Sequence, residues 1–589
     1  MVFSVSGLAW NRSVTGSLDY RIAMPSPHTH YFEVEIELKN FRGDDVDFNL
    51  PVWTPGSYLV REFAKNIEGF SVSTKDGKSL GFDKINKNTW RISAKDVDHL
   101  IVKYRVYAFD GYIRMSYLDE DHALIMANSL LMYVDDLKDQ SSVLYLSYPS
   151  SWNSISTSLT ALKDNEKAFY VPNYDILIDS PIEIGNHQII EFTAAGVPHE
   201  VAMVGRVMFD KDQLVRDLKK IIKSATAVFG ENPNEKYTFI VQTDQRAGGL
   251  EHMSSTVLGV SRWTFTNPQK YNYFLSLVAH EYFHLWMVKR IKPVELEIFD
   301  YSNEVYTDLL WVMEGFTSYF EEKIMLSCGY YSEQKFLNNL LSAMTNIQNT
   351  PGAKEQSVAE ASFDAWIKFY RKDENSINSQ ISYYQKGMAL GALLDLEVIA
   401  GSEGEKRLDD VVSQLYHQFY KKRNKGITSD DLQKALERAS HQNLDEFFKD
   451  YVTGTKDLDN AKYLDLAGIK LIETNKSTTS KSLGITFETY GDNLIVKSVV
   501  KGSAGYDHGI SAGDELISMN GYRINRSNIK VILNHYKAGD KVNILLSRKG
   551  LMVEKEIIIR KDSSVHYTYQ VVKNPSKRQV KVYEAWLKK

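Results

Sequence analysis

The segment His280-Glu281-Tyr282-Phe283-His284 constrains the fold of this chain more than any other stretch. If the segment is helical, its two histidines lie one turn apart on the same face, because residues four apart are neighbours on a helix. Two imidazoles so arranged can bind one Zn²⁺, and the glutamate between them can reach a water on the metal. The alternative is a helix with two half-buried histidines and a surface glutamate. The spacing favours a catalytic zinc site.

Length and composition limit the class of protein. At 589 residues, the chain exceeds what a single hydrophobic core usually holds, so several domains are expected. The net charge of −5 gives no reason to expect nucleic acid or an anionic membrane as a partner. The single cysteine, Cys328, excludes disulfides within the chain and a cysteine-based zinc site.

The first residues, Met1 to Tyr20, have no basic start followed by a long apolar run, which predicts no signal peptide. We also find no apolar run of 18 or more residues that would span a membrane. We therefore expect a cytoplasmic protein without a transmembrane segment. The alternative is a periplasmic or secreted protein whose leader has been removed.

Hydrophobic periodicity divides the chain into β-rich and helical parts. Residues 18–175 contain runs that alternate with period two, which predicts an antiparallel β-domain. Helical patterns dominate from Asp210 to Val452. Within this part, Asn267-Pro268 predicts the start of the helix that carries the two histidines, which should run to about Arg290. From Leu483 onward the pattern predicts strands again.

A catalytic zinc usually has three protein ligands and one open position for water. Two acids downstream of His284, Glu304 and Glu314, are candidates for the third ligand. Glu314 lies in the apolar helix pattern of Asp308–Ile324, where a carboxylate is costly to bury unless a cation meets it. Glu304 lies in a polar stretch, where a solvated position is expected. We therefore predict Glu314 as the ligand.

Several motifs resemble those of the gluzincin aminopeptidases and occur in the same order. Their zinc site is similar to the zinc motif together with Trp311–Tyr319. Their exopeptidase motif is similar to Gly248-Gly249-Leu250-Glu251-His252. The motif of their catalytic tyrosine is similar to Tyr384-Gln385-Lys386-Gly387. The 29 residues between His284 and Glu314 are more than the large aminopeptidase family has. This spacing resembles the glycyl aminopeptidase family, which has a C-terminal PDZ domain. Residues 52–58, 179–185, 287–293 and 363–366 fit the same family.

The resemblance implies a multidomain α+β protein. It predicts an N-terminal antiparallel β-domain, a thermolysin-like catalytic domain with a β lobe and an α-helical lobe, and a C-terminal PDZ domain. We place the β-domain at 1–175, the catalytic domain at 176–455, a linker at 456–475, the PDZ domain at 476–562 and a tail at 563–589, which adds a strand or is disordered.

The resemblance also implies roles for residues outside the zinc ligands. Glu281 would be the general base, Tyr384 would donate to the oxyanion, and Glu251, with Gly248 and Gly249, would bind the free α-amine of a peptide. Taken alone, the two glycines favour a turn, Glu251 a solvated acid and Tyr384 a packed tyrosine. Their joint order around an intact zinc motif favours the functional roles instead. The predicted activity is that of an aminopeptidase with one Zn²⁺ per chain that removes small N-terminal residues, Gly or Ala. The alternatives are a zinc endopeptidase of the same fold and an inactive PDZ scaffold.

The C-terminal motif Leu483-Gly484-Ile485 resembles the carboxylate-binding loop of PDZ domains. The following strand and the predicted helix Ile529–Tyr536 would take an extended peptide by strand addition. Alternatively, the chain's own tail or another domain fills this groove.

Overall fold

The computed structural model describes residues 14–475, 481–491 and 493–588. The chain divides into two compact units, Met1–Arg290 with Leu296–Val305 and Ile291–Glu295 with Tyr306–Lys589. The predicted classes of structure are confirmed: an N-terminal β-domain, a middle part with strands and helices, and a C-terminal part with the strands and helix predicted for a PDZ domain. Among the described residues, no helix is both long enough and apolar enough to cross a bilayer.

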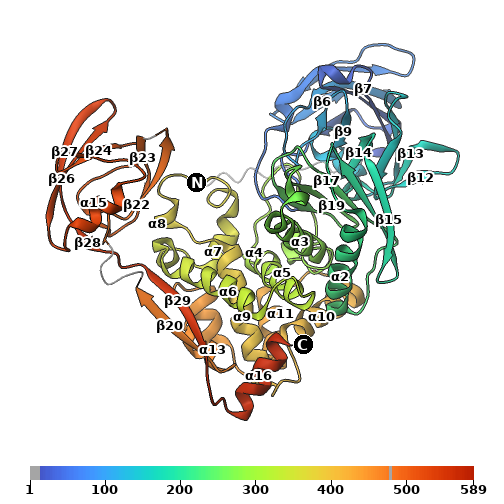
Figure 1. The fold of residues 1–589 in the computed structure, drawn as a ribbon. Helices are drawn as coiled ribbons and strands as arrows, with labels where there is room; N and C mark the ends of the chain where they lie inside the picture. The colour runs from blue at the N-terminus through green and yellow to red at the C-terminus, as the bar shows by residue number, and fades with distance from the viewer. Residues whose placement is uncertain (1–13, 476–480, 492, 589) are drawn as a thin grey trace, which may run out of the picture. The chain divides into compact units, whose positions relative to one another are not determined.

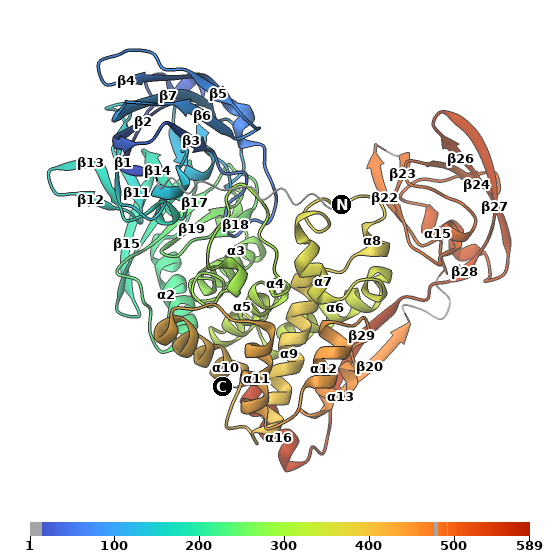
Figure 2. The same cartoon turned by 180° about the vertical axis from the view of Figure 1, so that it is seen from behind.

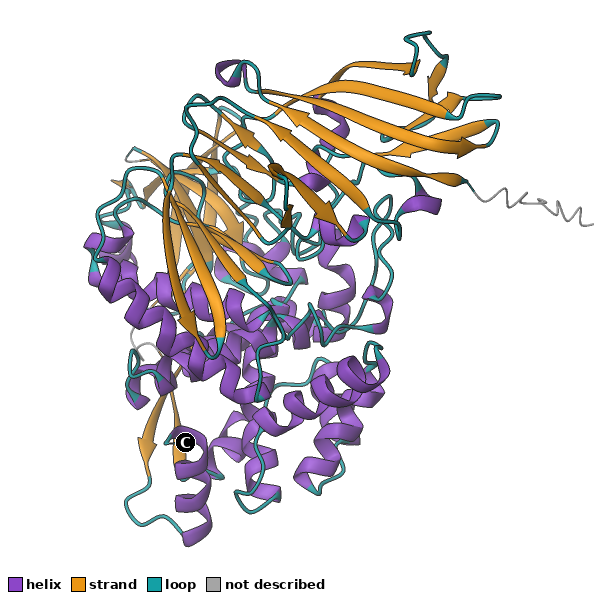
Figure 3. Cartoon of the chain, turned by 90° about the vertical axis from the view of Figure 1, so that its right-hand side faces the viewer, coloured by secondary structure: helices purple, strands orange, loops and turns teal. Residues whose placement is uncertain are grey.

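The first unit begins with a β-domain whose largest sheet is seven-stranded (orange in Figure 3). In the predicted strand at residues 31–38, Phe32, Val34, Ile36 and Leu38 are all buried, as the period of two requires. One pair in this sheet, β1 with β10, is parallel. The strands in order are β12 (Thr160–Leu162), β13 (Asn165–Val171), β10 (Ser142–Ser147), β1 (Thr15–Ala23), β2 (Tyr31–Arg42), β7 (His99–Tyr107) and β4 (Ile67–Thr74).

Two smaller sheets complete this domain, and a further sheet carries part of the site. The smaller sheets are β11 (Ser154–Thr157), β14 (Ile182–Gly185), β9 (His122–Ile125) and β8 (Tyr117–Leu118), and β3 (Asp45–Asn49), β6 (Thr89–Ser93) and β5 (Phe82–Lys84). The further sheet has the order β15 (Gln188–Ala194), β16 (Val197–Val204), β17 (Tyr237–Gln242), β19 (Ser255–Gly259) and β18 (Gly248–Glu251). In this sheet β18 is an edge strand, and the helix α3 (Pro268–Phe283) packs against it and against α2 (Lys211–Phe229).

The helix of the zinc motif starts where the sequence predicts. The side chain of Asn267 accepts a hydrogen bond from Lys270 N, and Pro268 occupies the first turn. The predicted end near Arg290 is wrong, because α3 ends at Phe283. His284 N still donates to His280 O at 3.3 Å, so the two histidines stay one turn apart.

Tertiary contacts end this helix early. Trp286 N donates to Phe283 O, three residues back instead of four, and Val288 adopts a left-handed conformation with φ of 67°. The buried guanidinium of Arg290 then donates to Leu285 O at 2.6 Å. The Arg290 side chain therefore supplies the hydrogen bond to Leu285 O that a backbone N–H would supply in a longer helix.

The second unit contains a helical lobe around α9 (Tyr383–Gly401), seen from behind in Figure 2. Most of α9 is buried, in accord with its apolar residues on all sides. The helices that contact it are α4 (Leu310–Met313), α5 (Gly315–Ser327), α6 (Glu333–Gln348), α7 (Val358–Phe363), α10 (Leu408–Leu415), α11 (Ser429–Ser440), α13 (Asn460–Asp465) and α16 (Lys577–Leu587).

The single helix predicted at residues 308–324 is instead two helices, α4 and α5, that meet at Glu314. Gly315 and Gly387 cross at this break, where a Cβ on Gly315 would lie 2.4 Å from Gly387 Cα. The close crossing of two backbones fixes the position of Glu314 between the helices.

The PDZ domain is a sheet with short helices (Figure 1). The strands predicted at residues 495–500 and 541–547 are present, and so is the helix predicted at residues 529–536. Its core includes Leu483, Val496, Leu516, Ile544 and Leu546. The elements are β22 (Ile485–Tyr490), β23 (Asn493–Val499), α14 (Ala504–Asp507), β24 (Glu515–Met519), β25 (Tyr522–Arg523), α15 (Ile529–His535), β26 (Lys541–Arg548) and β27 (Leu551–Ile558).

The predicted linker and tail are both structured in the residues described. Part of residues 456–475 forms α13 and β20 (Ile469–Asn475), and β20 pairs with β29 (Val565–Val571) from the predicted tail. The tail then forms α16, whose fully buried Trp586 donates Nε1–H to Tyr319 OH at 2.7 Å. The tail thus packs on the helical lobe, which is not the position expected if it filled the PDZ groove.

Candidate active site

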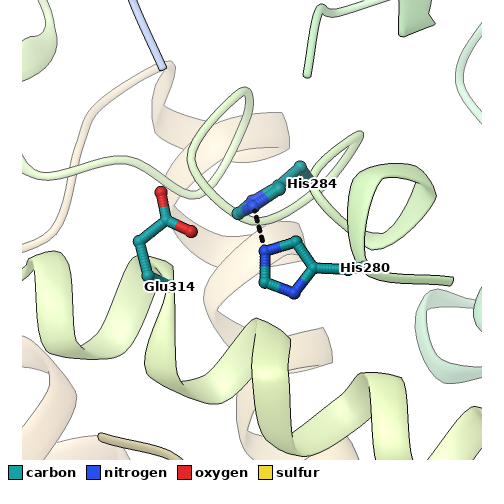
Figure 4. A group of neighbouring side chains, drawn as sticks. All are labelled: His280, His284 and Glu314. Atoms are coloured by element: carbon teal, nitrogen blue, oxygen red, sulfur yellow. Dashed lines mark hydrogen bonds between the residues drawn. The ribbon is translucent and has the colours of Figure 1, made fainter. Parts of the chain in front are cut away.

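The two histidines of the zinc motif face each other. Nε2 of His280 and Nε2 of His284 lie 3.1 Å apart (Figure 4). Since Zn–N bonds are 2.0–2.1 Å, two tetrahedral ligands are expected about 3.3 Å apart. His284 is buried and His280 is half-buried, so one edge of the pair is open to solvent. The spacing of the two nitrogen atoms fits one shared zinc ion.

Glu314 completes a set of three ligands. One ligand atom each from His280, His284 and Glu314 lies within 4.8 Å of the other two (Figure 4). Glu314 is only 2% exposed, as predicted for a carboxylate that meets a cation. Glu304 is half-buried and does not belong to this group. Two imidazoles and a carboxylate are a common ligand set for catalytic zinc, so the residues fit that metal.

Glu251, Glu281 and His284 form a second, overlapping group within the same distance limit. Both carboxylates of this group are buried in the first unit. Two buried carboxylates that share a site repel each other unless a cation or proton lies between them. The two carboxylates can therefore attract either a metal ion or the ammonium group of a ligand. Substitution of Glu251 distinguishes metal binding from ammonium binding.

Gly249 has a steric reason to be glycine. A Cβ at this position would lie 1.9 Å from Glu281 Oε1, so any side chain would displace that carboxylate. Gly249 lies within β18 and not in a turn, which removes one of the two sequence interpretations. The edge strand thus forms the surface on which Glu281 lies.

Glu251 is held in a buried position with unused hydrogen-bonding capacity. It is 4% exposed, and its Oε1 atom has no hydrogen-bond partner among the described residues. A Cβ on Gly56 would lie 2.5 Å from this oxygen, so the loop at residues 52–58 closes against the carboxylate. The sequence alone indicates no role for this loop, because its contact with Glu251 joins residues far apart in the chain.

Tyr384 lies in the first turn of α9, where its ring stacks on Tyr383 and Phe369. Burial, and then the charge of Glu314, raise the pKa of Tyr384 well above its ordinary value. The phenol is therefore neutral over the physiological pH range and can donate its proton in a hydrogen bond.

A buried ion pair supports the β18–β19 hairpin. Asp179 accepts hydrogen bonds from Lys289 Nζ at 2.8 Å, from Met253 N at 2.7 Å and from His252 Nδ1 at 3.1 Å. Burial alone would raise the pKa of Asp179, but Lys289 and His252 outweigh it and hold the pKa well below its ordinary value. Two motifs without a sequence-derived role, residues 179–185 and 287–293, thus meet behind the site. Their opposite charges were the only signal of this contact.

In the PDZ domain, the predicted carboxylate loop lies beside a groove between β22 and α15. Leu483 is buried, Gly484 has φ of 67°, and Val500 N donates to Gly484 O at 2.8 Å. Both apolar and polar side chains line the groove, and α15 contributes the apolar Ile529 and Leu533. This arrangement is able to accept an extended peptide.

Comparison with known proteins identifies the family. Residues 19–186 match the family model of the Peptidase M61 N-terminal domain, residues 273–390 that of the M61 glycyl aminopeptidases, and residues 481–559 that of a PDZ domain. The crystal structure of an aminopeptidase N family protein from Idiomarina loihiensis is 30% identical, with a TM-score of 0.89 over 97% of this chain and 100% of that chain. The chain belongs to the M61 glycyl aminopeptidase family. The predicted peptide hydrolase is therefore confirmed.

A more distant match to this M61 peptidase is an M1 zinc metallopeptidase from Deinococcus radiodurans, 13% identical with a TM-score of 0.47 over 76% of this chain and 95% of that chain. No curated protein matches the chain. The roles of the individual site residues stay predictions, and so do the domain boundaries.

Proposed function

We propose that this M61 peptidase is a zinc-dependent aminopeptidase that removes small N-terminal residues, Gly or Ala, from peptides. The observation that carries the proposal is the buried Glu251 carboxylate, which lies within 4.8 Å of Glu281 and His284 and whose Oε1 atom has no hydrogen-bond partner in the described part of the chain. A substrate ammonium supplies the missing partner. An internal peptide bond has no such charge, so the site favours peptides with a free N-terminus over internal cleavage.

The ligand set supports one zinc per chain, held by His280, His284 and Glu314. When bound there, zinc would lower the pKa of a water at the site to about 7 and would polarise the scissile carbonyl. The second group is less suited to the metal, because it would use Glu281 as a ligand and leave the reaction without a nearby base. The zinc motif favours the first group, in which Glu281 is not a ligand and moves protons instead.

Glu281 accepts the proton of the attacking water and passes it to the leaving amine. Its position against Gly249 keeps the carboxylate at the edge of β18. Tyr384, a neutral phenol, donates to the oxygen that gains negative charge. Glu251 binds the α-ammonium, so the first peptide bond alone is in register with the base.

The contact of Gly56 with Glu251 supports the preference for a small first residue. Backbone atoms of the loop at residues 52–58 approach the carboxylate so closely that a single Cβ would clash with it. Little room is then left on that side of a bound ammonium. The family description as glycyl aminopeptidases agrees with this reasoning.

The experiment is the Glu251→Gln substitution, assayed on alanine 4-nitroanilide and on its N-acetylated counterpart. Loss of a charged hydrogen-bond partner is expected to lower kcat/KM on the free amine by about 10–100-fold. The blocked substrate is expected to be a poor one for both proteins. Equal activity of the unsubstituted protein on blocked and free substrates would instead indicate an endopeptidase.

We also propose that the PDZ groove binds a peptide and that the protein acts in the cytoplasm. The tail's position on α9 supports the first proposal, because it leaves the groove's apolar lining to another ligand. A fluorescence titration with peptides that end in a free carboxylate tests it, with the same peptides as amides for comparison.

A further inference from the structure

Arg114 contacts the edge strand of the site from the β-domain. Its Nη2 atom donates to Gly249 O at 2.8 Å, and a Cβ on Gly248 would lie 3.8 Å from its Nη1 atom. The Glu281 carboxylate lies on the side of Gly249 where a side chain would project. A single residue of β18 therefore separates the guanidinium from the proposed base. Arg114, Gly249 and Glu281 all belong to the first unit.

No anion pairs with this arginine within the part of the chain that the structure describes. Its Nε atom is buried and makes no hydrogen bond, and no carboxylate of the described residues forms an ion pair with it. A partly buried guanidinium without a counter-charge is costly, and its planar array of donors is suited to a carboxylate. The strand carbonyl uses only one of the five N–H donors. The other N–H donors of the guanidinium are suited to bind a negatively charged ligand.

The pattern of β18 shows where such a ligand would lie. His252 N donates to Ser255 O in the hairpin that joins β18 to β19. Because hydrogen-bonded pairs alternate along two antiparallel strands, the N–H and C=O groups of Leu250 and Gly248 also point toward β19. The main-chain groups of Gly249 and Glu251 point away from β19, toward the edge of the sheet where Gly249 O accepts the Arg114 hydrogen bond. An extended peptide with its amine on Glu251 would run along this edge, antiparallel to β18, toward Gly249 and Arg114.

The separation of the two charged side chains defines a length. At the usual rise of a strand, residues 249 and 251 lie about 7 Å apart, and residues 248 and 251 lie about 10 Å apart. These values match the distance between the two ends of an extended dipeptide or tripeptide. Glu251 has the charge to bind the amine at one end, and Arg114 has the charge to bind the carboxylate at the other.

We propose that Arg114 binds the C-terminal carboxylate of the substrate, and that the substrates are dipeptides and tripeptides with both termini free. This inference rests on the proposed function, because Glu251 must bind the amine for the register to hold. It adds a substrate length and a residue that selects it.

The test is calorimetric binding of Ala-Ala and Ala-Ala-Ala, each as free acid and as C-terminal amide, to the zinc-loaded Glu281→Gln protein. The free acids are expected to bind about tenfold more tightly than the amides, as for a charge-assisted hydrogen bond. Adding Arg114→Gln is expected to reduce this difference to less than twofold without weakening binding of the amides.

Two further variants separate a specific contact from a general charge effect. Arg114→Lys keeps the charge and should retain part of the preference. Arg246→Gln removes the same charge from an exposed arginine, whose guanidinium lies 4.2 Å from the Tyr112 ring, and should leave the preference unchanged. Thermal unfolding of each variant checks that it is folded.

Equal binding of acids and amides by the Arg114-containing protein would overturn the inference, as would a full preference in the Arg114→Gln variant. If Arg114→Gln does not fold, the acid–amide comparison and the Arg114→Lys variant still decide. Failure of the aminopeptidase proposal has a different signature, because it appears as no cleavage of free-amine substrates and no effect of Glu251→Gln.

Discussion

At the scale of single residues, the site depends on two glycines whose missing side chains let carboxylates approach the backbone. Gly249 makes room for Glu281, and Gly56 makes room for Glu251. Neither contact can be deduced from local sequence, because each joins a strand or loop to a side chain distant in the chain. The zinc ligands differ in this respect, since the spacing of His280 and His284 within one helix already defines their geometry.

Gly249→Ala tests the first of these contacts. The added Cβ would lie 1.9 Å from Glu281 Oε1 and must displace it, so kcat/KM should fall by about 10²–10⁴, as for loss of a general base. Zinc content should not change. Gly81→Ala is the control, because a Cβ there would meet no atom within 4 Å, and it should leave kcat/KM unchanged. A fully active Gly249→Ala protein would contradict the assigned position of the base.

At the scale of elements, the sequence predicted the type of most helices and strands but not where tertiary contacts end or join them. The start of α3 follows from Asn267 and Pro268, which act locally. Its end depends on Arg290, and the break at Glu314 depends on the crossing of Gly315 and Gly387. Pairing of β20 with β29 joins segments about 100 residues apart, from Ile469 with Val571 to Asn475 with Val565, which a local pattern cannot reveal.

The C-terminal helix α16 is expected to stabilise the helical lobe. Trp586 is fully buried, its Nε1–H donates to Tyr319 OH, and that hydroxyl donates to Asp395 at 2.5 Å. Trp586→Ala should lower the free energy of unfolding by about 3–5 kcal/mol, because it leaves a cavity and removes a hydrogen bond.

Chemical denaturation measures this loss. Val580→Ala in the same helix changes a 39% exposed side chain and should cost less than about 1 kcal/mol. Equal effects of the two substitutions would show that α16 does not depend on its buried tryptophan.

At the scale of the whole molecule, buried ion pairs give stability a pH dependence. Burial alone would lower the pKa of His122, but the charge of Glu183 and their 2.8 Å hydrogen bond outweigh it and raise the pKa to about 9. Since the unfolded pKa is about 6.5, this pair stabilises the fold fully below that pH and loses its effect as the pH rises to 9. Asp179 has a lowered pKa, so its contribution is lost on acidification below about pH 4.

The melting temperature, measured with zinc in excess, should therefore fall between pH 6.5 and pH 9. The loss in stability from His122 is at most about 3 kcal/mol. In a His122→Gln/Glu183→Gln double variant, the same rise in pH should cost less stability. An unchanged slope in the double variant would assign the alkaline loss to other groups.

Zinc content per chain, measured by mass spectrometry of the purified protein, tests the central claim most directly. The unsubstituted protein, Glu251→Gln and Glu304→Ala should each retain one zinc, and Glu314→Ala should lose it, since Glu314 is the third ligand. A full zinc content in Glu314→Ala, or its loss in Glu251→Gln, would contradict the assignment of His280, His284 and Glu314 as the metal site.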